Sequence, residues 1–261
     1  EIEVVGHKID YLHLQNHRFG CDGLMACWKN DLTVTPVART PWQQNFGKFS
    51  HALDEMVTKG FRRYEVTLRS GEHIVVYNMH MDASDDEDEA EQKDAKDREA
   101  RMAQWTQLKE DVLQNLDTRP IIITGDLNSL YTRDDVKSVF VNAINETGRG
   151  TVSDVWEELR QQEEETLDKI LYINPPTGTK IKPIAYSLDK DGYRFDGKAL
   201  GDHYPVAATF QVISSATGIS TIDNPSLTID NYYNLNGQRV RQPRNGIYIK
   251  QNGEKAEKRI I

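Results

Sequence analysis

The segment Pro120–Asn128 reads PIIITGDLN, and it decides the fold because it joins a continuous apolar run to a polar turn. Residues 121–123 are all isoleucine, a pattern typical of a strand that is covered on both faces. Gly125 and Asp126 end the strand. A carboxylate at that point can hold a hard divalent cation or orient a water, whereas the alternative is an Asp that caps the next helix. The segment therefore predicts a buried strand with a polar group at its end.

The neighbouring segments predict both strands and helices. Residues 62–68 and 73–81 are rich in Val, Ile, Tyr and Thr and flank Ser70-Gly71, which indicates a hairpin. Apolar residues recur at three- and four-residue steps over 94–116, as on a helix with one apolar stripe. Further helices are expected near 134–142 and 153–161, and further strands over 169–173, 184–188 and 206–212.

Composition limits the possible classes of protein. A chain of 261 residues with 38% hydrophobic residues can bury one large core and carry a small appendage. Its apolar runs fall far short of the roughly 20 residues that span a bilayer, so we expect no transmembrane segment. The net charge of −9 argues against a broad basic surface for duplex binding, although a local metal and a few arginines can still hold a phosphate. Cys21 and Cys27 lack zinc spacing and are expected to be packing residues.

A second polar set, Asn78-Met79-His80-Met81-Asp82, lies at the end of another expected strand. Strand alternation would place Asn78, His80 and Asp82 on one face. An imidazole between an amide and a carboxylate suits phosphate binding. The alternative is that His80 is a core histidine whose hydrogen bonds are satisfied.

A third polar set precedes the last expected strand, in Gly201-Asp202-His203-Tyr204-Pro205-Val206. A histidine acts as a general base when a carboxylate orients it. Asp168 begins a strand and could supply that carboxylate. Asn128, two residues after Asp126, could donate to a phosphate oxygen.

Taken in order, these motifs resemble the endonuclease/exonuclease/phosphatase (DNase I-like) superfamily. Its members show Asn-x-His-x-Asp, then Gly-Asp-x-Asn, then Asp-x-Ile, then Ser-Asp-His-x-Pro-Val, and this chain departs only in having Gly201 for the serine. The segment Arg98–Gln104 is similar to the Arg-x-x-Gln helix of the superfamily. The resemblance covers about residues 11–212.

The resemblance implies an α/β fold, a four-layer α/β/β/α sandwich of two packed mixed sheets. It implies phosphate contacts from three side chains, Asn78, His80 and Asn128. It implies metal contacts from three carboxylates, Asp82, Asp126 and Asp202. His203, oriented by Asp168, would act as base or phosphate ligand, which makes His80, Asp126, Asn128, Asp168 and His203 the catalytic set. The implied cofactor is Mg²⁺, which Mn²⁺ or Ca²⁺ could replace.

One expected motif is missing near the start of the chain. Members of the superfamily begin with a strand that bears an Asn and then a Gln-Glu whose Glu is a principal metal ligand. Neither precedes Tyr11 in recognisable form, so we expect the sequence to be an N-terminally incomplete piece of a longer protein. This departure leaves open a catalytically inactive binding protein on the same scaffold.

Two domains are expected, a catalytic domain over 1–213 and a linker with a small β module over 214–261. Asn-Gly pairs at 236–237, 245–246 and 252–253 signal hairpins in the second part. Residues 233–250 resemble the C-terminal modules of secreted proteins of Bacteroidetes-type bacteria, which implies secretion or a place on a bacterial cell surface. The alternative is a plain terminal hairpin pair with no sorting role.

The leading hypothesis is therefore a secreted, Mg²⁺-dependent phosphodiester hydrolase that acts as a nuclease. We expect it to be a monomer whose substrate is nucleic acid rather than lipid. A phospholipid head-group hydrolase of the sphingomyelinase kind, or a phosphatase, is the enzymatic alternative. An apolar hairpin near the site would favour lipid, and a basic groove would favour nucleic acid.

Overall fold

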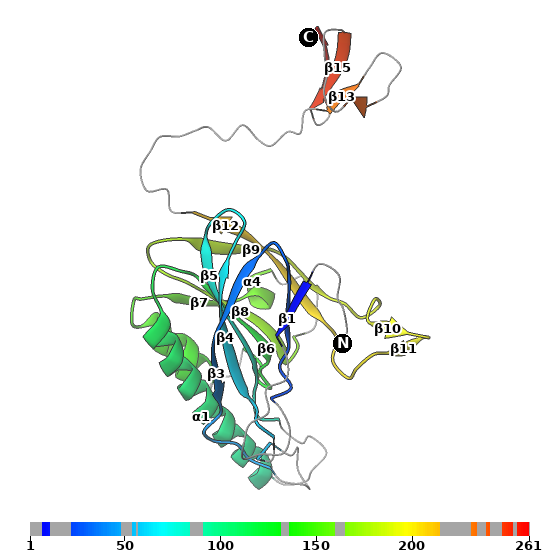
Figure 1. Ribbon diagram of the computed structural model, residues 1–261. Coiled ribbons are helices and arrows are strands. Elements are labelled where there is room, and N and C mark those ends of the chain that lie inside the picture. Colours follow the sequence, from blue (N-terminus) through cyan, green and yellow to red (C-terminus); the bar gives the residue numbers. More distant parts are fainter. Residues whose placement is uncertain are drawn as a thin grey trace. The chain divides into compact units, whose positions relative to one another are not determined.

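The computed structural model describes residues 7–10, 22–47, 54–55, 57–83, 91–131, 136–159, 165–214, 231–233, 239–240, 247–252 and 255–260. The chain divides into two compact units, Glu1–Ser215 and Ala216–Ile261. All side chains predicted to act in the site belong to the first unit, which is the larger (Figure 1).

The first unit is built on a six-stranded sheet with the order β3-β4-β5-β6-β8-β7. Its strands are β3 (Thr33–Pro41), β4 (Gly60–Thr67), β5 (His73–His80), β6 (Ile121–Asp126), β7 (Thr151–Asp154) and β8 (Asp168–Asn174). β5 and β6 pair in parallel, and every other pair in this sheet is antiparallel. The predicted buried strand at residues 121–123 is thus an inner strand of a mixed sheet.

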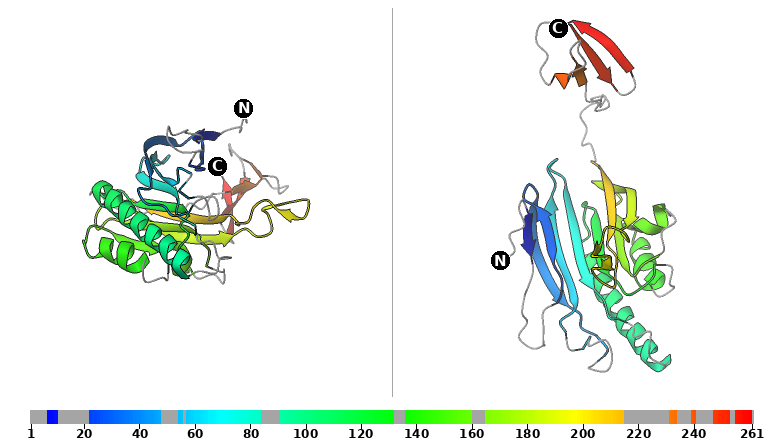
Figure 2. Two further views of the ribbon diagram at one scale, coloured as in Figure 1. Left: turned by 90° about the horizontal axis from the view of Figure 1, so that it is seen from below. Right: turned by 90° about the vertical axis from the view of Figure 1, so that its right-hand side faces the viewer.

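Helices cover one face of this sheet. The long helix α1 (Glu91–Asn115) buries Trp105, Leu108 and Val112 in one core cluster with Ile121 and Ile123 of β6. The one-stripe helix expected over 94–116 is therefore present. The π-helical turn η1 (Lys137–Asn142) and α3 (Ala143–Asn145) follow, and Figure 2 shows α1 lying along this side of the sheet.

Short antiparallel ladders pack on the opposite face. β9 (Lys180–Leu188) pairs with β12 (Val206–Ile213), and Tyr172 of β8 meets Phe210 of β12 edge-on at 5.7 Å between ring centroids. β1 (His7–Asp10) pairs with β2 (Ala26–Lys29), whose Trp28 lies 6.3 Å from the ring of Tyr64. The expected α/β fold with two packed sheets is confirmed.

Two local details differ from expectation or add to it. The helix expected over 153–161 begins only at Val155, as α4 (Val155–Leu159), because residues 151–154 pair with β8 instead. Between β9 and β12 the chain forms a hairpin of β10 (Arg194–Phe195) and β11 (Lys198–Ala199), which projects from the unit in Figure 1.

The second unit holds a small antiparallel sheet with the order β14-β13-β15-β16. These strands are β13 (Asn231–Tyr233), β14 (Arg239–Val240), β15 (Ile247–Asn252) and β16 (Lys255–Ile260). Its sorting role stays a prediction. Among the described residues, no helix combines the length and apolar character that crossing a bilayer requires.

Gly125 offers a direct test of how β5 and β6 approach each other. Its φ is +134°, and a Cβ there would lie 1.9 Å from the carbonyl oxygen of Met79. Gly148 is a matched control, because its φ is also positive, at +66°, but a Cβ would meet nothing within 4 Å. We expect Gly125→Ala to lower the free energy of unfolding by about 3 kcal/mol and Gly148→Ala by about 1 kcal/mol. Urea unfolding midpoints measure both, and equal losses would contradict the close approach.

Candidate active site

Three polar residues form a row across adjacent strands. His80 ends β5, Asp126 ends β6 and Asp168 begins β8, and the register pairs His80 with Asp126 and Asp126 with Asp168. Directly paired residues in a sheet point to the same face. Residues at the alternate positions of these strands, Met79 in β5, Ile123 in β6 and Leu171 in β8, belong to the α1 core, so the row lies on the face that carries the second sheet.

Contacts within this row bring in a fourth residue from another segment. His80 Nε2 lies 3.3 Å from Asp126 Oδ2. His203, which lies between β11 and β12, uses its Nδ1 to hydrogen-bond Asp168 Oδ2. All four side chains keep some exposure to solvent, from 18% for Asp126 to 43% for His203. The structure thus brings together His80, Asp126, Asp168 and His203.

The same group could hold a divalent metal. Asp126, Asp168 and His203 each offer a ligand atom, and these atoms lie within 4.8 Å of one another. Mg²⁺ in proteins is commonly held by one or two carboxylates together with substrate phosphate and water. The carboxylates of Asp126 and Asp168 meet that requirement, and the imidazole of His203 is already bonded to Asp168. The donor set therefore fits a hard divalent cation.

The two histidines have opposite electrostatic surroundings. Burial and the nearby Lys59 lower the pKa of His80 to about 4, against the pull of Asp126 in the other direction. For His203, burial lowers the pKa, but the bond to Asp168 and the charges of Asp126 and Asp202 outweigh it, so the pKa lies above its ordinary value. His80 is thus neutral near pH 7, and His203 gains a proton more readily.

The turn after β6 fixes the orientation of Asp126. Asn128 has a φ of +45°, and its backbone N–H donates to Asp126 Oδ1 at 3.0 Å. Its side-chain Nδ2 donates to the carbonyl oxygen of Met81 at 3.1 Å. Asn128 therefore ties the end of β6 to the end of β5, and Asp126 closes this local turn.

Asp82, expected as a metal ligand, lies in a different environment. β5 ends at His80, so the alternation that would have placed Asp82 on the site face does not continue. Its side chain is fully buried and accepts a hydrogen bond from the Phe46 N–H at 2.7 Å. Burial, together with Asp54 and Asp97, raises the pKa of Asp82 to about 8. Asp82 is therefore not among the groups that could share one metal with Asp126.

Asp202 and Asn78 lie near the row without joining it. Asp202 is exposed and acts on His203 through its charge, but it is not one of the clustered ligand groups. Asn78 lies two residues before His80 on the same face of β5, and its Nδ2 donates to the carbonyl oxygen of Met25 at 3.0 Å. It joins the sheet to the segment before β2.

Lys59 is a site neighbour that no sequence motif indicated. It is 7% exposed, forms an ion pair with Asp54 and donates to the carbonyl oxygen of Met81 at 3.2 Å. Its charge helps to keep His80 neutral. A single lysine before a strand carries no pattern, so only the contacts of the folded chain reveal it.

Comparison with solved structures shows the fold. The human Nocturnin catalytic domain aligns with 80% of this chain and 73% of its own length, at 16% identity and a TM-score of 0.51. An endonuclease/exonuclease/phosphatase family protein from Bacteroides thetaiotaomicron aligns at 17% identity over 81% of this chain and 75% of its own, with a TM-score of 0.47. Humanized TDP2 of D. rerio aligns at 20% identity over 60% of this chain, with a TM-score of 0.44, and the chain spans 59% of its length.

Sequence comparison identifies a family that matches part of the chain. No curated protein sequence matches the chain. Residues 35–174 match the family described as the BREX system PglZ alkaline phosphatase-like domain, which is more than half of the chain. This range runs from β3 to the end of β8 and stops before His203. The fold is similar to that of the human Nocturnin catalytic domain, and over residues 35–174 the chain belongs to the PglZ alkaline phosphatase-like family.

Proposed function

We propose that this protein is a metal-dependent phosphodiester hydrolase in which His203 acts as general base. The observation that carries the proposal is the bond between Asp168 and His203 beside the carboxylate of Asp126. Phosphoester chemistry needs a cation, a base and donors for the phosphate at one place. The four clustered side chains supply this set.

Each side chain has a distinct task in this proposal. Asp168 accepts the Nδ1–H of His203 and so leaves Nε2 free to take a proton from the attacking water. Neutral His80 can donate its Nε2–H to Asp126 or to a phosphate oxygen. Asp126 and Asp168 would hold the divalent ion, for which we propose Mg²⁺. When bound, such an ion neutralises charge on the phosphate and acidifies a bound water.

The two enzymatic candidates, a nuclease and a phospholipid head-group hydrolase, differ in the class of substrate. A secreted, monomeric nuclease is the candidate from the sequence, and it remains a proposal. Two arginines that could have served a nucleic-acid groove are already engaged. Arg62 is buried against Asp22 with Nε to Oδ2 at 2.8 Å, and Arg63 contacts Asp111 at 3.0 Å.

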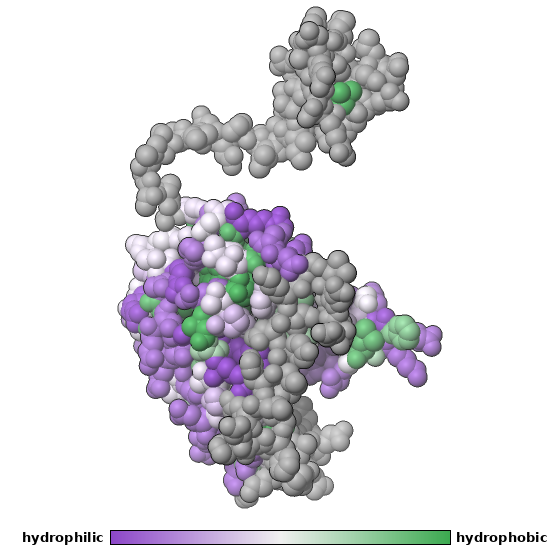
Figure 3. Space-filling model, viewed as in Figure 1, coloured by the Kyte–Doolittle hydropathy of each residue, from purple (hydrophilic) through white to green (hydrophobic). Residues whose placement is uncertain are grey.

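One observation favours the second candidate, a phospholipid head-group hydrolase. The β10–β11 hairpin carries Phe195, which is 76% exposed, and Leu200, which is 58% exposed, follows it on the way to His203. Figure 3 shows apolar colour on this projecting segment. Arg194 and Lys198 on the same hairpin are exposed and positively charged. Apolar and basic side chains together suit a lipid–water interface.

Replacing the base tests the proposal directly. We expect His203→Ala to reduce Mg²⁺-dependent hydrolysis of bis(p-nitrophenyl) phosphate by roughly 10²–10⁴-fold, because proton transfer is lost. EDTA should stop the reaction in the unaltered protein. His73→Ala is the matched control, since His73 begins the strand that His80 ends. Full activity of His203→Ala would overturn the assignment.

The two histidines should also have different pKa values. In metal-free protein, NMR of the imidazole protons should show His203 titrating above 6.5 and His80 at about 4. Asp168→Asn removes the negative charge that stabilises the imidazolium, so the pKa of His203 should fall while that of His80 changes little. Equal values for both histidines in the unaltered protein would contradict the different roles given to them.

Variants near the β10–β11 hairpin should distinguish a lipid substrate from a nucleic-acid substrate. We expect Phe195→Ser combined with Leu200→Ser to lower hydrolysis of choline phospholipids in vesicles by about 10-fold or more, because burying each side chain contributes about 1.5–3 kcal/mol. Hydrolysis of the soluble diester should not change. Val37→Ser, at a residue of β3 that is 43% exposed, controls for general loss of surface apolarity. Cleavage of DNA with no cleavage of vesicles would support the nuclease instead.

A further inference from the structure

An apolar pocket of about 270 Å³ lies on the face of the six-stranded sheet that carries the second sheet. Val76 lines the pocket, and His80 ends the same strand four residues later, on the same face by strand alternation. At a rise of about 3.3 Å per residue, the two lie roughly 13 Å apart. None of the four clustered side chains of the proposed active site lines the pocket. The pocket is therefore a separate place in the fold.

The lining of this pocket carries no charged side chain. β3, β4 and β5 contribute residues from the six-stranded sheet, and β2 contributes residues from the ladder packed on it. The lining residues are Ala26, Cys27, Trp28, Leu32, Val34, Tyr64, Val66, Leu68, Ile74 and Val76. A phosphate, a metal ion or a carboxylate would lose its hydration here without gaining a partner of opposite charge. The occupant must therefore be uncharged and largely apolar.

This part of the core is less completely filled than the part beneath α1. Tyr64 and Ile74 are buried, but Val34 and Val76, which pack against them, are only partly buried. A buried apolar cavity of about 150 Å³ stays dry and takes up benzene. The present pocket is larger, so a small apolar molecule has a suitable size for it.

Trp28 offers an unused donor at the pocket. Its indole ring lines the pocket and lies 6.3 Å from the ring of Tyr64. The Nε1 atom is shielded from solvent and has no hydrogen-bond partner among the described residues. An indole N–H can only donate, and a shielded donor without an acceptor is costly. An apolar ligand that brings one acceptor to Trp28 removes this cost.

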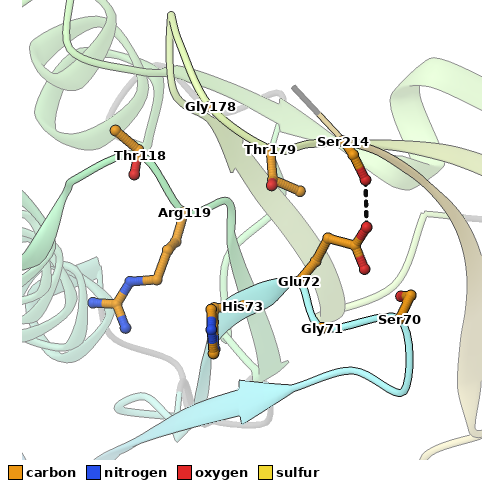
Figure 4. A pocket seen from close by; sticks show the side chains of 9 residues that line it. All are labelled: Ser70, Gly71, Glu72, His73, Thr118, Arg119, Gly178, Thr179 and Ser214. Carbon is orange, nitrogen blue, oxygen red and sulfur yellow. Dashed lines mark hydrogen bonds between the residues drawn. The ribbon is translucent and has the colours of Figure 1, made fainter. Parts of the chain in front are cut away.

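Hydrogen bonds hold the rim of the pocket in place at the β4–β5 turn. The N–H of Leu68 donates to the carbonyl oxygen of Glu72 at 2.9 Å, and the N–H of Gly71 donates to that of Leu68 at 3.0 Å. The carboxylate of Glu72 also accepts the hydroxyl of Ser214, the residue after β12 (Figure 4). The turn is thus tied to a second strand. A preformed rim lowers the entropic cost of binding a small ligand.

We propose that this pocket binds one neutral aliphatic chain that carries a single carbonyl oxygen, such as a medium-chain ketone or ester. The chain packs against the side chains of β3, β4 and β5, and the carbonyl oxygen accepts the Nε1–H of Trp28. The proposal goes beyond the phosphodiesterase function, and either can fail without the other, because binding is measured without turnover.

Calorimetry and methyl-detected NMR on the full chain test the proposal, with 2-octanone as the probe. We expect a Kd of about 1 mM or tighter. The methyl signals of Ile74, which lines the pocket, should shift, whereas those of Ile121 in the α1 core should not. Octanoate near pH 7 should bind more weakly by roughly 10-fold or more, because its charge would be desolvated in an uncharged lining.

Three variants locate the binding. Trp28→Phe keeps an aromatic ring but removes the N–H, so it should weaken binding of 2-octanone by roughly 3- to 10-fold. Val34→Phe should fill part of the pocket and weaken binding by about 10-fold or more. Val37→Phe is the matched control, since Val37 belongs to the same strand, is exposed and does not line the pocket.

Equal thermal melts of Trp28→Phe and the unaltered protein exclude unfolding as the cause of weaker binding. No binding of 2-octanone, equal binding of octanoate, or unchanged affinity in both Trp28→Phe and Val34→Phe would each overturn the proposal. A dimer in sedimentation equilibrium that Val34→Phe dissociates would assign the pocket to a second copy of the chain and would overturn it as well.

Discussion

The backbone register between β5, β6 and β8 determines where the polar groups of the site lie. It pairs His80 with Asp126 and Asp126 with Asp168, so three side chains reach one face at one end of the sheet. A shift of one residue would turn each of these side chains to the α1 core. The alternate positions in the same strands are fully buried apolar residues such as Ile123 and Leu171, and this burial fixes the register.

The protonation of the two histidines in the site then depends on the charged groups next to each of them. Asp168 hydrogen-bonds His203, Asp126 lies against His80, and the charge of Lys59 acts on His80. As a result, two histidines of ordinary chemistry acquire different protonation behaviour within one cluster. One is suited to stay neutral and donate, and the other to exchange a proton.

Much of this arrangement could be predicted because it is local. The isoleucines of β6, the apolar stripe of α1 and the motifs around His80 and Asp126 each occupy one short segment with a clear period or turn. Asp82 shows the limit of such reasoning, since alternation holds only while the strand continues. Lys59 had no sequence signal, because its surroundings come from segments that only the fold brings together.

The most direct test of the account is the position of a bound divalent ion. Anomalous diffraction from crystals soaked in Mn²⁺ should show a peak at a coordinating distance, about 2 Å, from a carboxylate oxygen of Asp126, with Asp168 and His203 around it. A peak instead among the buried carboxylates of Asp54, Asp82 and Asp97, or no peak near Asp126, would contradict the account.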